Sequence, residues 1–81
     1  MQNKNAIPLT HVPVGQKVNL VQIKGGREIK HRLVEMGLTP GVEVRVLQDS
    51  GGPLILAVRD SRIALGRGMA YRLEVALATN Q

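Results

Sequence analysis

Hydrophobic and polar residues alternate along several short stretches of the chain. In the clearest one, Val42, Val44 and Val46 alternate with Glu43 and Arg45. A period of two puts one face of a strand against a core and the other in solvent, which predicts a half-buried β-strand. Similar alternation, rich in aliphatic and β-branched residues, predicts further strands at residues 17–24, 54–58, 63–65 and 73–77.

The first of these stretches has apolar residues on both of its faces. Alternation along residues 17–24 puts Leu20 and Gln22 on one side and Val21 and Ile23 on the other. A pair of glycines follows, and such a pair is typical of a turn. We therefore expect the strand to end before the glycine pair.

The period of the pattern changes between Arg27 and Met36. Ile29, Leu33 and Met36 fall at positions i, i+4 and i+7, which form one apolar stripe along a helix. Charged side chains occupy most of the other positions. The sequence therefore predicts a short helix over Arg27–Met36, with Leu33 packed into the core.

The end of this helix is marked by residues that favour termination. Gly37 stands where a helix C-cap needs a residue at positive φ, and Leu38 can fold back onto the last turn. Pro40 cannot continue a helix, and Gly41 opens the next strand. We therefore expect Gly37 to adopt a positive φ.

Five short strands with one helix inserted after the first predict a mostly β, single-domain protein. Strands with one apolar face each can bury those faces by curling into a small barrel, which also limits exposed sheet edges. Residues 66–70 predict a single helical turn before the last strand, and Asp60 with Ser61 predicts a turn between two strands. The domain spans residues 1–81 with its core at about 9–77, and residues 1–5 and 79–81 are expected to be frayed ends.

Composition narrows the functional class. The chain has 81 residues, no cysteine, and Tyr71 as its only aromatic residue, so disulfides and thiolate metal sites are excluded. Its polar beginning lacks the apolar stretch of a signal peptide, and no apolar run is long enough for a membrane span. We therefore expect a cytoplasmic protein. The net charge of +5 favours contact with phosphates, an acidic membrane surface or an acidic protein, although solubility alone also requires some charge.

Three runs of residues resemble one protein family. They are residues 25–44 (GGREIKHRLVEMGLTPGVEV), residues 9–16 (LTHVPVGQ) and residues 58–65 (VRDSRIAL). Together they resemble the FeoA proteins, small cytosolic accessories of bacterial ferrous iron uptake, over nearly the whole chain. The resemblance implies a five-stranded SH3-like barrel. It also implies a partner, the membrane iron transporter FeoB with its cytoplasmic GTP-binding domain.

The same module also resembles the C-terminal domain of iron-dependent repressors similar to the diphtheria toxin repressor. Because no winged-helix domain precedes it here, we expect the free-standing accessory. One departure is Asp60, where the family usually carries glycine in the turn. Aspartate tolerates left-handed geometry better than most residues, so the departure does not argue against the fold.

Catalytic, nucleotide and metal sites are not expected. His11, His31 and the two serines, Ser50 and Ser61, suggest no set of nucleophile, base and carboxylate. The Gly25–Gly26 pair before the helix lacks the lysine and hydroxyl of a phosphate-binding loop, which favours a simple turn. The two histidines lie far apart in the sequence, and neighbouring cations make His31 a poor metal ligand. We therefore expect no enzyme activity, no cofactor and no bound metal.

Two kinds of partner remain for the basic helix. Small barrels do bind nucleic acid, but single-strand binders usually stack bases on aromatic side chains, which this chain lacks apart from one tyrosine. A protein partner, FeoB, is therefore favoured. The predicted surface has basic residues at its rim and the apolar segment Met36–Leu38 at its centre. Alternatively, Leu38 is buried against the helix and does not reach the surface. The candidate residues are Arg27, Lys30, Arg32, Met36, Gly37 and Leu38.

Overall fold

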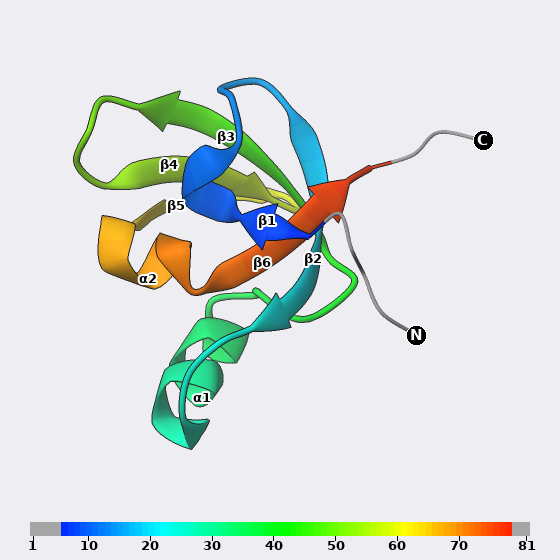
Figure 1. Ribbon diagram of the computed structural model, residues 1–81, viewed down its shortest axis with the longest axis vertical. Coiled ribbons are helices and arrows are strands. Elements are labelled where there is room, and N and C mark those ends of the chain that lie inside the picture. Colours follow the sequence, from blue (N-terminus) through cyan, green and yellow to red (C-terminus); the bar gives the residue numbers. More distant parts are fainter. Residues whose placement is uncertain (1–5, 79–81) are drawn as a thin grey trace.

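One curled sheet and one projecting helix make up the structure. The computed structural model describes residues 6–78, so the two expected frayed ends lie outside the described residues. Helix α1 projects from the sheet beyond the end of β2 (Figure 1), and in the chain it connects β2 to β3. The elements in chain order are β1 (Ile7–Pro8), the 3₁₀-helix η1 (Leu9–His11), β2 (Lys17–Ile23), α1 (Arg27–Glu35), β3 (Glu43–Asp49), β4 (Leu54–Val58), β5 (Ser61–Leu65), α2 (Arg67–Tyr71) and β6 (Leu73–Leu77).

The mostly β fold class is confirmed, but the expected count of five strands is wrong. All neighbouring strands are antiparallel, and their order across the sheet is β1-β6-β2-β3-β4-β5. The additional strand, β1, has two residues, with Ile7 opposite Val75 and Pro8 opposite Glu74 of β6. Two residues are too few for a pattern of alternation, and proline has no backbone N–H to donate to the ladder. This strand therefore depends on the partner strand that the fold supplies.

A bulge in β2 overturns the expected facing of its last residues. The pairing with β6 shifts register between Leu20 and Gln22, so one extra residue enters the strand. After the bulge the alternation is inverted: Ile23 is buried with Val18 and Leu20, while Gln22 is exposed. A second shift occurs in β3 where it pairs with β4. Bulges bend strands and increase their twist, which suits a sheet that curls around a core.

The loops beside β4 also differ slightly from expectation. Strand β3 continues to Asp49, which was expected in the following loop. The turn between β4 and β5 consists of Arg59 and Asp60, because Ser61 already pairs with Val58. Among the described non-glycine residues, Arg59 alone has a positive φ, at 55°. The left-handed position therefore precedes Asp60, and the expected turn at Asp60 and Ser61 is wrong by one residue.

Helix α1 ends as its sequence predicts. Gly37 has φ 93°, its N–H donates to the carbonyl of Val34 at 2.9 Å, and the N–H of Leu38 donates to the carbonyl of Leu33 at 3.0 Å. These two bonds form a Schellman motif, which satisfies carbonyls that a helix end would otherwise leave without partners. Leu33 and Leu38 are both fully buried. The motif therefore turns the chain inward and anchors the C-terminal end of α1.

A substitution at Gly37 should test the backbone part of this motif. A Cβ atom at this position would lie 3.9 Å from Cγ1 of Val58, an ordinary contact, so space is not the obstacle. Because L-residues resist positive φ, and β-branched ones most of all, Gly37→Val should lower the free energy of unfolding by about 1–2 kcal/mol. Urea unfolding measures this loss. Gly37→Asn is the matched variant and should lose less stability, because asparagine tolerates positive φ better than valine does. Equal stability of the Gly37→Val protein and the unchanged protein would contradict the role of Gly37 as the helix cap.

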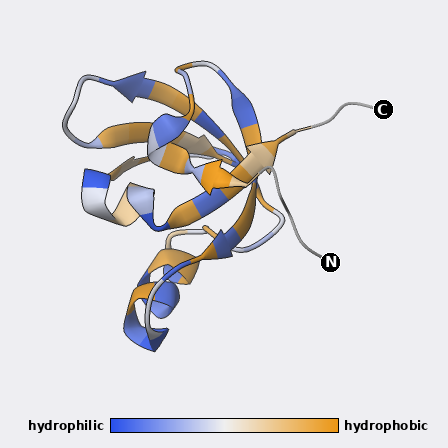
Figure 2. Ribbon diagram, viewed as in Figure 1, coloured by the Kyte–Doolittle hydropathy of each residue, from blue (hydrophilic) through white to orange (hydrophobic). Residues whose placement is uncertain are grey.

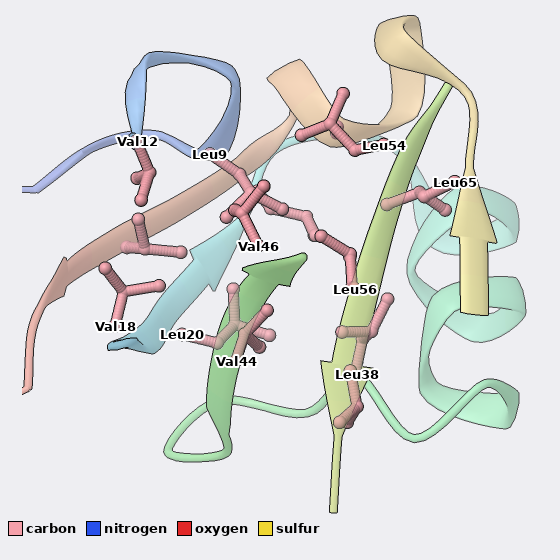
Figure 3. Close-up of a cluster of buried hydrophobic side chains, with 14 of the residues drawn as sticks. Leu9, Val12, Val18, Leu20, Leu38, Val44, Val46, Leu54, Leu56 and Leu65 are labelled. Carbon is pink, nitrogen blue, oxygen red and sulfur yellow. The ribbon is translucent and has the colours of Figure 1, made fainter. Parts of the chain in front are cut away.

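The core is a single apolar cluster inside the curled sheet. Every described strand except β1 contributes to it, together with η1, α1, α2 and three loop residues. Figure 2 shows hydrophobic and hydrophilic residues alternating along the strands, and Figure 3 shows the buried side chains that meet between them. No polar or charged residue is buried within residues 6–78. The described core is therefore built from apolar side chains alone.

Candidate functional site

One candidate surface is the outer side of helix α1. Arg27, Lys30, His31 and Val34 follow a spacing of three and four residues, so they share one side of the helix. They line a shallow depression of about 450 Å³. All four are exposed, and Val34 keeps 45% of its surface in solvent. We call these four residues the helix face; they combine positive charge with one exposed apolar side chain.

The other sequence-predicted site residues lie elsewhere. Arg32 is exposed, but about 100° of rotation per residue puts it on the opposite side of α1 from Lys30. Met36 is half-buried and packs against the core. Gly37 and Leu38 form the helix end, and of the two alternatives left open for Leu38 the structure has the buried one. The exposed apolar residue beside the cations is therefore Val34, which the sequence did not single out.

The residues expected to be structural lie in α1, at its end and in the turn into β3. Leu33 is fully buried, as expected. Gly41 has φ 97°, and its N–H donates to the carbonyl of Leu20 at 2.7 Å. Pro40 is exposed directly before it. This turn ties the segment after α1 to strand β2, so the position of α1 is fixed at its C-terminal end.

The two histidines lie in different parts of the fold. His11 ends η1, and its ring centroid lies 6.4 Å from that of Tyr71, with the ring planes at 59°. His31 on α1 lies 3.1 Å from a carboxylate oxygen of Glu35, one turn further along the helix. Both side chains of this pair are exposed, so the pair contributes little to stability. No group of three or more potential metal-ligating side chains occurs among residues 6–78.

A second candidate surface is a cleft between η1, α2 and the start of β6. Its volume is about 700 Å³, and its lining includes His11, Lys24, Arg67, Tyr71, Arg72 and Glu74. We call it the η1–α2 cleft. Helix α2 and η1 contact each other, so residues far apart in the sequence meet at its walls. A volume of roughly 300–1,000 Å³ is usual for a ligand pocket.

Two ion pairs hold cations at the η1–α2 cleft. Nζ of Lys24 lies 3.0 Å from Oε2 of Glu74, and the other carboxylate oxygen, Oε1, accepts a hydrogen bond from Gln22 at 3.1 Å. The hydrogen bond from Lys24, followed by that from Gln22, lowers the pKa of Glu74. The carboxylate of Glu74 is therefore held in its ionised form beside Lys24.

The second pair joins α2 to the last residue of β3. The guanidinium of Arg67 donates to the carboxylate of Asp49 and, from Nε, to the carbonyl of Gly51 at 3.2 Å. The backbone N–H of Gly51 donates to the same carboxylate at 3.1 Å. The hydrogen bond from Arg67, and then that from Gly51, lowers the pKa of Asp49. These contacts fix the guanidinium of Arg67 at the edge of the cleft.

Sequence reasoning missed the η1–α2 cleft because its residues come together only through the fold. The backbone N–H of Lys24 donates to the carbonyl of Arg72 at 2.7 Å, a contact that depends on the pairing of β2 with β6. One local signal was available. Arg67 and Tyr71 are four residues apart, and a helical turn expected at residues 66–70 that continued by one residue would put them on one side.

No helix in the described part of the chain is long and apolar enough to cross a membrane.

The curled antiparallel sheet, with its core of aliphatic residues and its surface cleft, defines a small β domain. A crystal structure titled as an iron uptake regulatory protein (FeoA) has the same fold, with a TM-score of 0.85. It is 39% identical to this chain, and the match covers 90% of this chain and 99% of that one. The expected SH3-like fold class is therefore confirmed.

The chain belongs to the FeoA domain family, whose model matches residues 7–77. A protein of Methanocaldococcus jannaschii named "Putative Fe(2+) transport protein A" is 35% identical over 68 residues. That match covers 84% of this chain and 83% of the archaeal protein. The predicted family resemblance is therefore confirmed from one end of the described core to the other.

The fold also occurs inside larger proteins. A manganese-dependent transcriptional repressor in complex with manganese matches 94% of this chain with a TM-score of 0.86, but the match covers only 38% of the repressor. Sequence identity is 18%, so this likeness concerns the fold alone.

Proposed function

We propose that this protein is a cytoplasmic accessory of ferrous iron uptake that acts by binding the membrane transporter FeoB. Membership of the FeoA domain family supports this role, as does the similarity to an archaeal protein named for Fe(2+) transport. The observation that carries the binding mode is the helix face, where two permanent cations, a histidine and an exposed valine lie together. Such a surface suits an acidic partner with a small apolar contact at its centre.

The partner would meet the helix face first through charge. Arg27 and Lys30 are exposed and have no ion-pair partner among residues 6–78, so their field reaches into solvent. Complementary charge raises the rate of encounter, and burial of Val34 then slows dissociation. In this proposal Met36 lies at the flank of the contact, whereas Arg32, on the opposite side of α1, adds to the positive field without touching the partner. Gly37 and Leu38 act by holding the end of α1 in place.

We further propose that the protein is not an enzyme and that GTP hydrolysis belongs to the transporter. All 17 buried apolar residues of the core leave the interior without polar groups, and the described carboxylates with shifted pKa values are held in surface ion pairs. The isolated chain is therefore expected neither to hydrolyse GTP nor to bind it with micromolar affinity. Calorimetry with GTP measures the second expectation directly.

Recovery of the transporter tests the proposed function. The tagged full chain is expressed in cells that contain FeoB, membranes are solubilised, and bound proteins are identified by mass spectrometry. We expect FeoB to be recovered, and the purified cytoplasmic region of FeoB to bind the chain directly. Recovery of nucleic acid with high sequence selectivity, and no binding to FeoB, would contradict the proposal and favour a nucleic-acid-binding domain.

A further inference from the structure

The η1–α2 cleft contains the only aromatic residue of the chain. Tyr71 keeps 58% of its surface in solvent, and its ring is tilted against that of His11. The core is built entirely from aliphatic side chains, so the single tyrosine is not used for packing. Tyrosine offers a large, rigid contact area at low entropic cost and is enriched at binding hot spots. Its position suggests a binding surface.

Positive charge surrounds this tyrosine in a fixed arrangement. Arg67 shares one side of α2 with Tyr71 and is held in place by Asp49 and the loop after β3. Lys24 is held by Glu74, and its backbone is hydrogen-bonded to Arg72.

Arg72 differs from the other two cations. It is exposed, lines the cleft, and has no ion pair among the described residues. The cleft therefore has two oriented cations and a third, Arg72, available to an incoming anion.

We infer that the η1–α2 cleft binds a short acidic peptide segment of another protein, with Arg72 contacting a carboxylate and Tyr71 contacting the adjoining apolar part. An arginine fork matches a carboxylate geometrically, and the exposed ring provides the apolar platform beside it. This site is separate from the helix face, because neither Arg27 nor Lys30 lines the cleft. The inference does not require that the partner be FeoB.

The charges of the cleft favour a peptide over a nucleic acid. Glu74 lines it, and Asp49 adjoins Arg67, so two carboxylates stand among three cations. A strand of nucleic acid brings a phosphate with every nucleotide and would meet these carboxylates. A peptide can space its acidic residues to avoid them, and its N–H groups can donate to Glu74. The single tyrosine also offers no series of stacking platforms for successive bases.

Selection of peptides by the full chain tests the inference. A library of short random peptides is panned on the immobilised protein, and the affinity of the enriched sequences is measured by fluorescence polarisation. We expect enrichment of net-negative peptides that contain an apolar residue. Addition of such a peptide should shift the amide NMR signals of His11, Lys24 and Tyr71.

Three variants assign the binding to residues. Arg72→Glu and Tyr71→Ala should each lower the affinity for the selected peptides by at least about tenfold, because arginine and tyrosine at hot spots contribute much of the binding energy. Arg62→Glu makes the same charge change on β5, outside the cleft, and should change affinity little. Thermal unfolding of each variant confirms that the fold is retained, as expected for exposed side chains.

The remaining outcomes would overturn the inference. Enrichment of peptides without acidic residues, or unchanged peptide affinity in the Arg72→Glu protein, would show that the cleft does not bind carboxylates. Loss of peptide binding in an Arg27→Glu protein, but not in the Arg72→Glu protein, would show that the peptides bind the helix face. Tighter binding of oligo-dT than of any selected peptide, lost in Arg72→Glu, would make the cleft a nucleic-acid site. None of these results depends on whether the chain recovers FeoB, so the two proposals can fail separately.

Discussion

Replacing Leu33 with alanine should lower the free energy of unfolding by about 2–4 kcal/mol. Leu33 is the single buried residue of α1 and is fully inaccessible to solvent. Its removal takes apolar surface from the core and leaves a cavity that the neighbours fill only in part. A domain of this size has a total stability of roughly 5–15 kcal/mol, so this one side chain accounts for a large share.

The loss should also loosen α1 from the sheet. The helix has nine residues, too few to persist alone in water, and Ile29 and Met36 are only partly buried beside Leu33. Urea unfolding should therefore show a lower midpoint, and hydrogen exchange should be faster in α1 than in the sheet. Val34→Ala is the matched control at the next position. Val34 is exposed, so that change should stay within about 0.5 kcal/mol. A Leu33→Ala protein as stable as this control would contradict the packing of Leu33 in the core.

Local chemistry explains which parts of the fold could be predicted from the sequence. The end of α1 depends on neighbouring residues only, because Gly37 supplies the positive φ and Leu38 the returning apolar contact. Strand β4 has the predicted bounds, Leu54–Val58, because its two apolar faces and its flanking turns are visible in the chain itself. Where a structure is decided within a few residues, the pattern is sufficient.

The parts that could not be predicted depend on partners distant in the chain. The bulge between Leu20 and Gln22 arises from the pairing of β2 with β6, and a strict period of two therefore misplaces Ile23. Strand β1 exists because β6 is available beside it. The η1–α2 cleft joins residues from both ends of the chain for the same reason. By contrast, the helix face lies within eight consecutive residues, and its two permanent cations were predicted as site residues.

Reversing the charges of the helix face should slow the capture of the transporter. In the double variant Arg27→Glu with Lys30→Glu, two attractive charges become repulsive toward an acidic partner. We expect the association rate constant for the cytoplasmic region of FeoB to fall by about tenfold or more at low ionic strength. The difference should shrink as salt rises, because the Debye length falls from about 30 Å at 0.01 M to about 8 Å at 0.15 M. Dissociation should change less, and stopped-flow fluorescence separates the two rates.

A matched double variant separates the position of the charges from their sum. Arg45 and Arg62 are exposed on β3 and β5, where both pair with Ala57 of the strand between them. Reversing both to glutamate gives the same net charge as the helix-face variant. If local steering by the helix face guides binding, this control should keep most of the association rate. Equal losses in the two variants would show that only the overall charge of the protein matters.

Salt dependence then distinguishes a protein partner from nucleic acid. Each phosphate contact releases a condensed counterion, so binding to nucleic acid should weaken steeply and linearly on a logarithmic salt scale. A contact centred on Val34 should keep a salt-insensitive part, because burial of apolar surface does not depend on screening. Val34→Ala should accordingly speed dissociation from FeoB while leaving association and its salt dependence unchanged. Random DNA and RNA, measured at the same physiological salt, should bind the chain more weakly than FeoB does. If they bind more tightly than FeoB, and the helix-face double variant abolishes that binding, then the cations of α1 bind phosphates and the proposed accessory role is wrong.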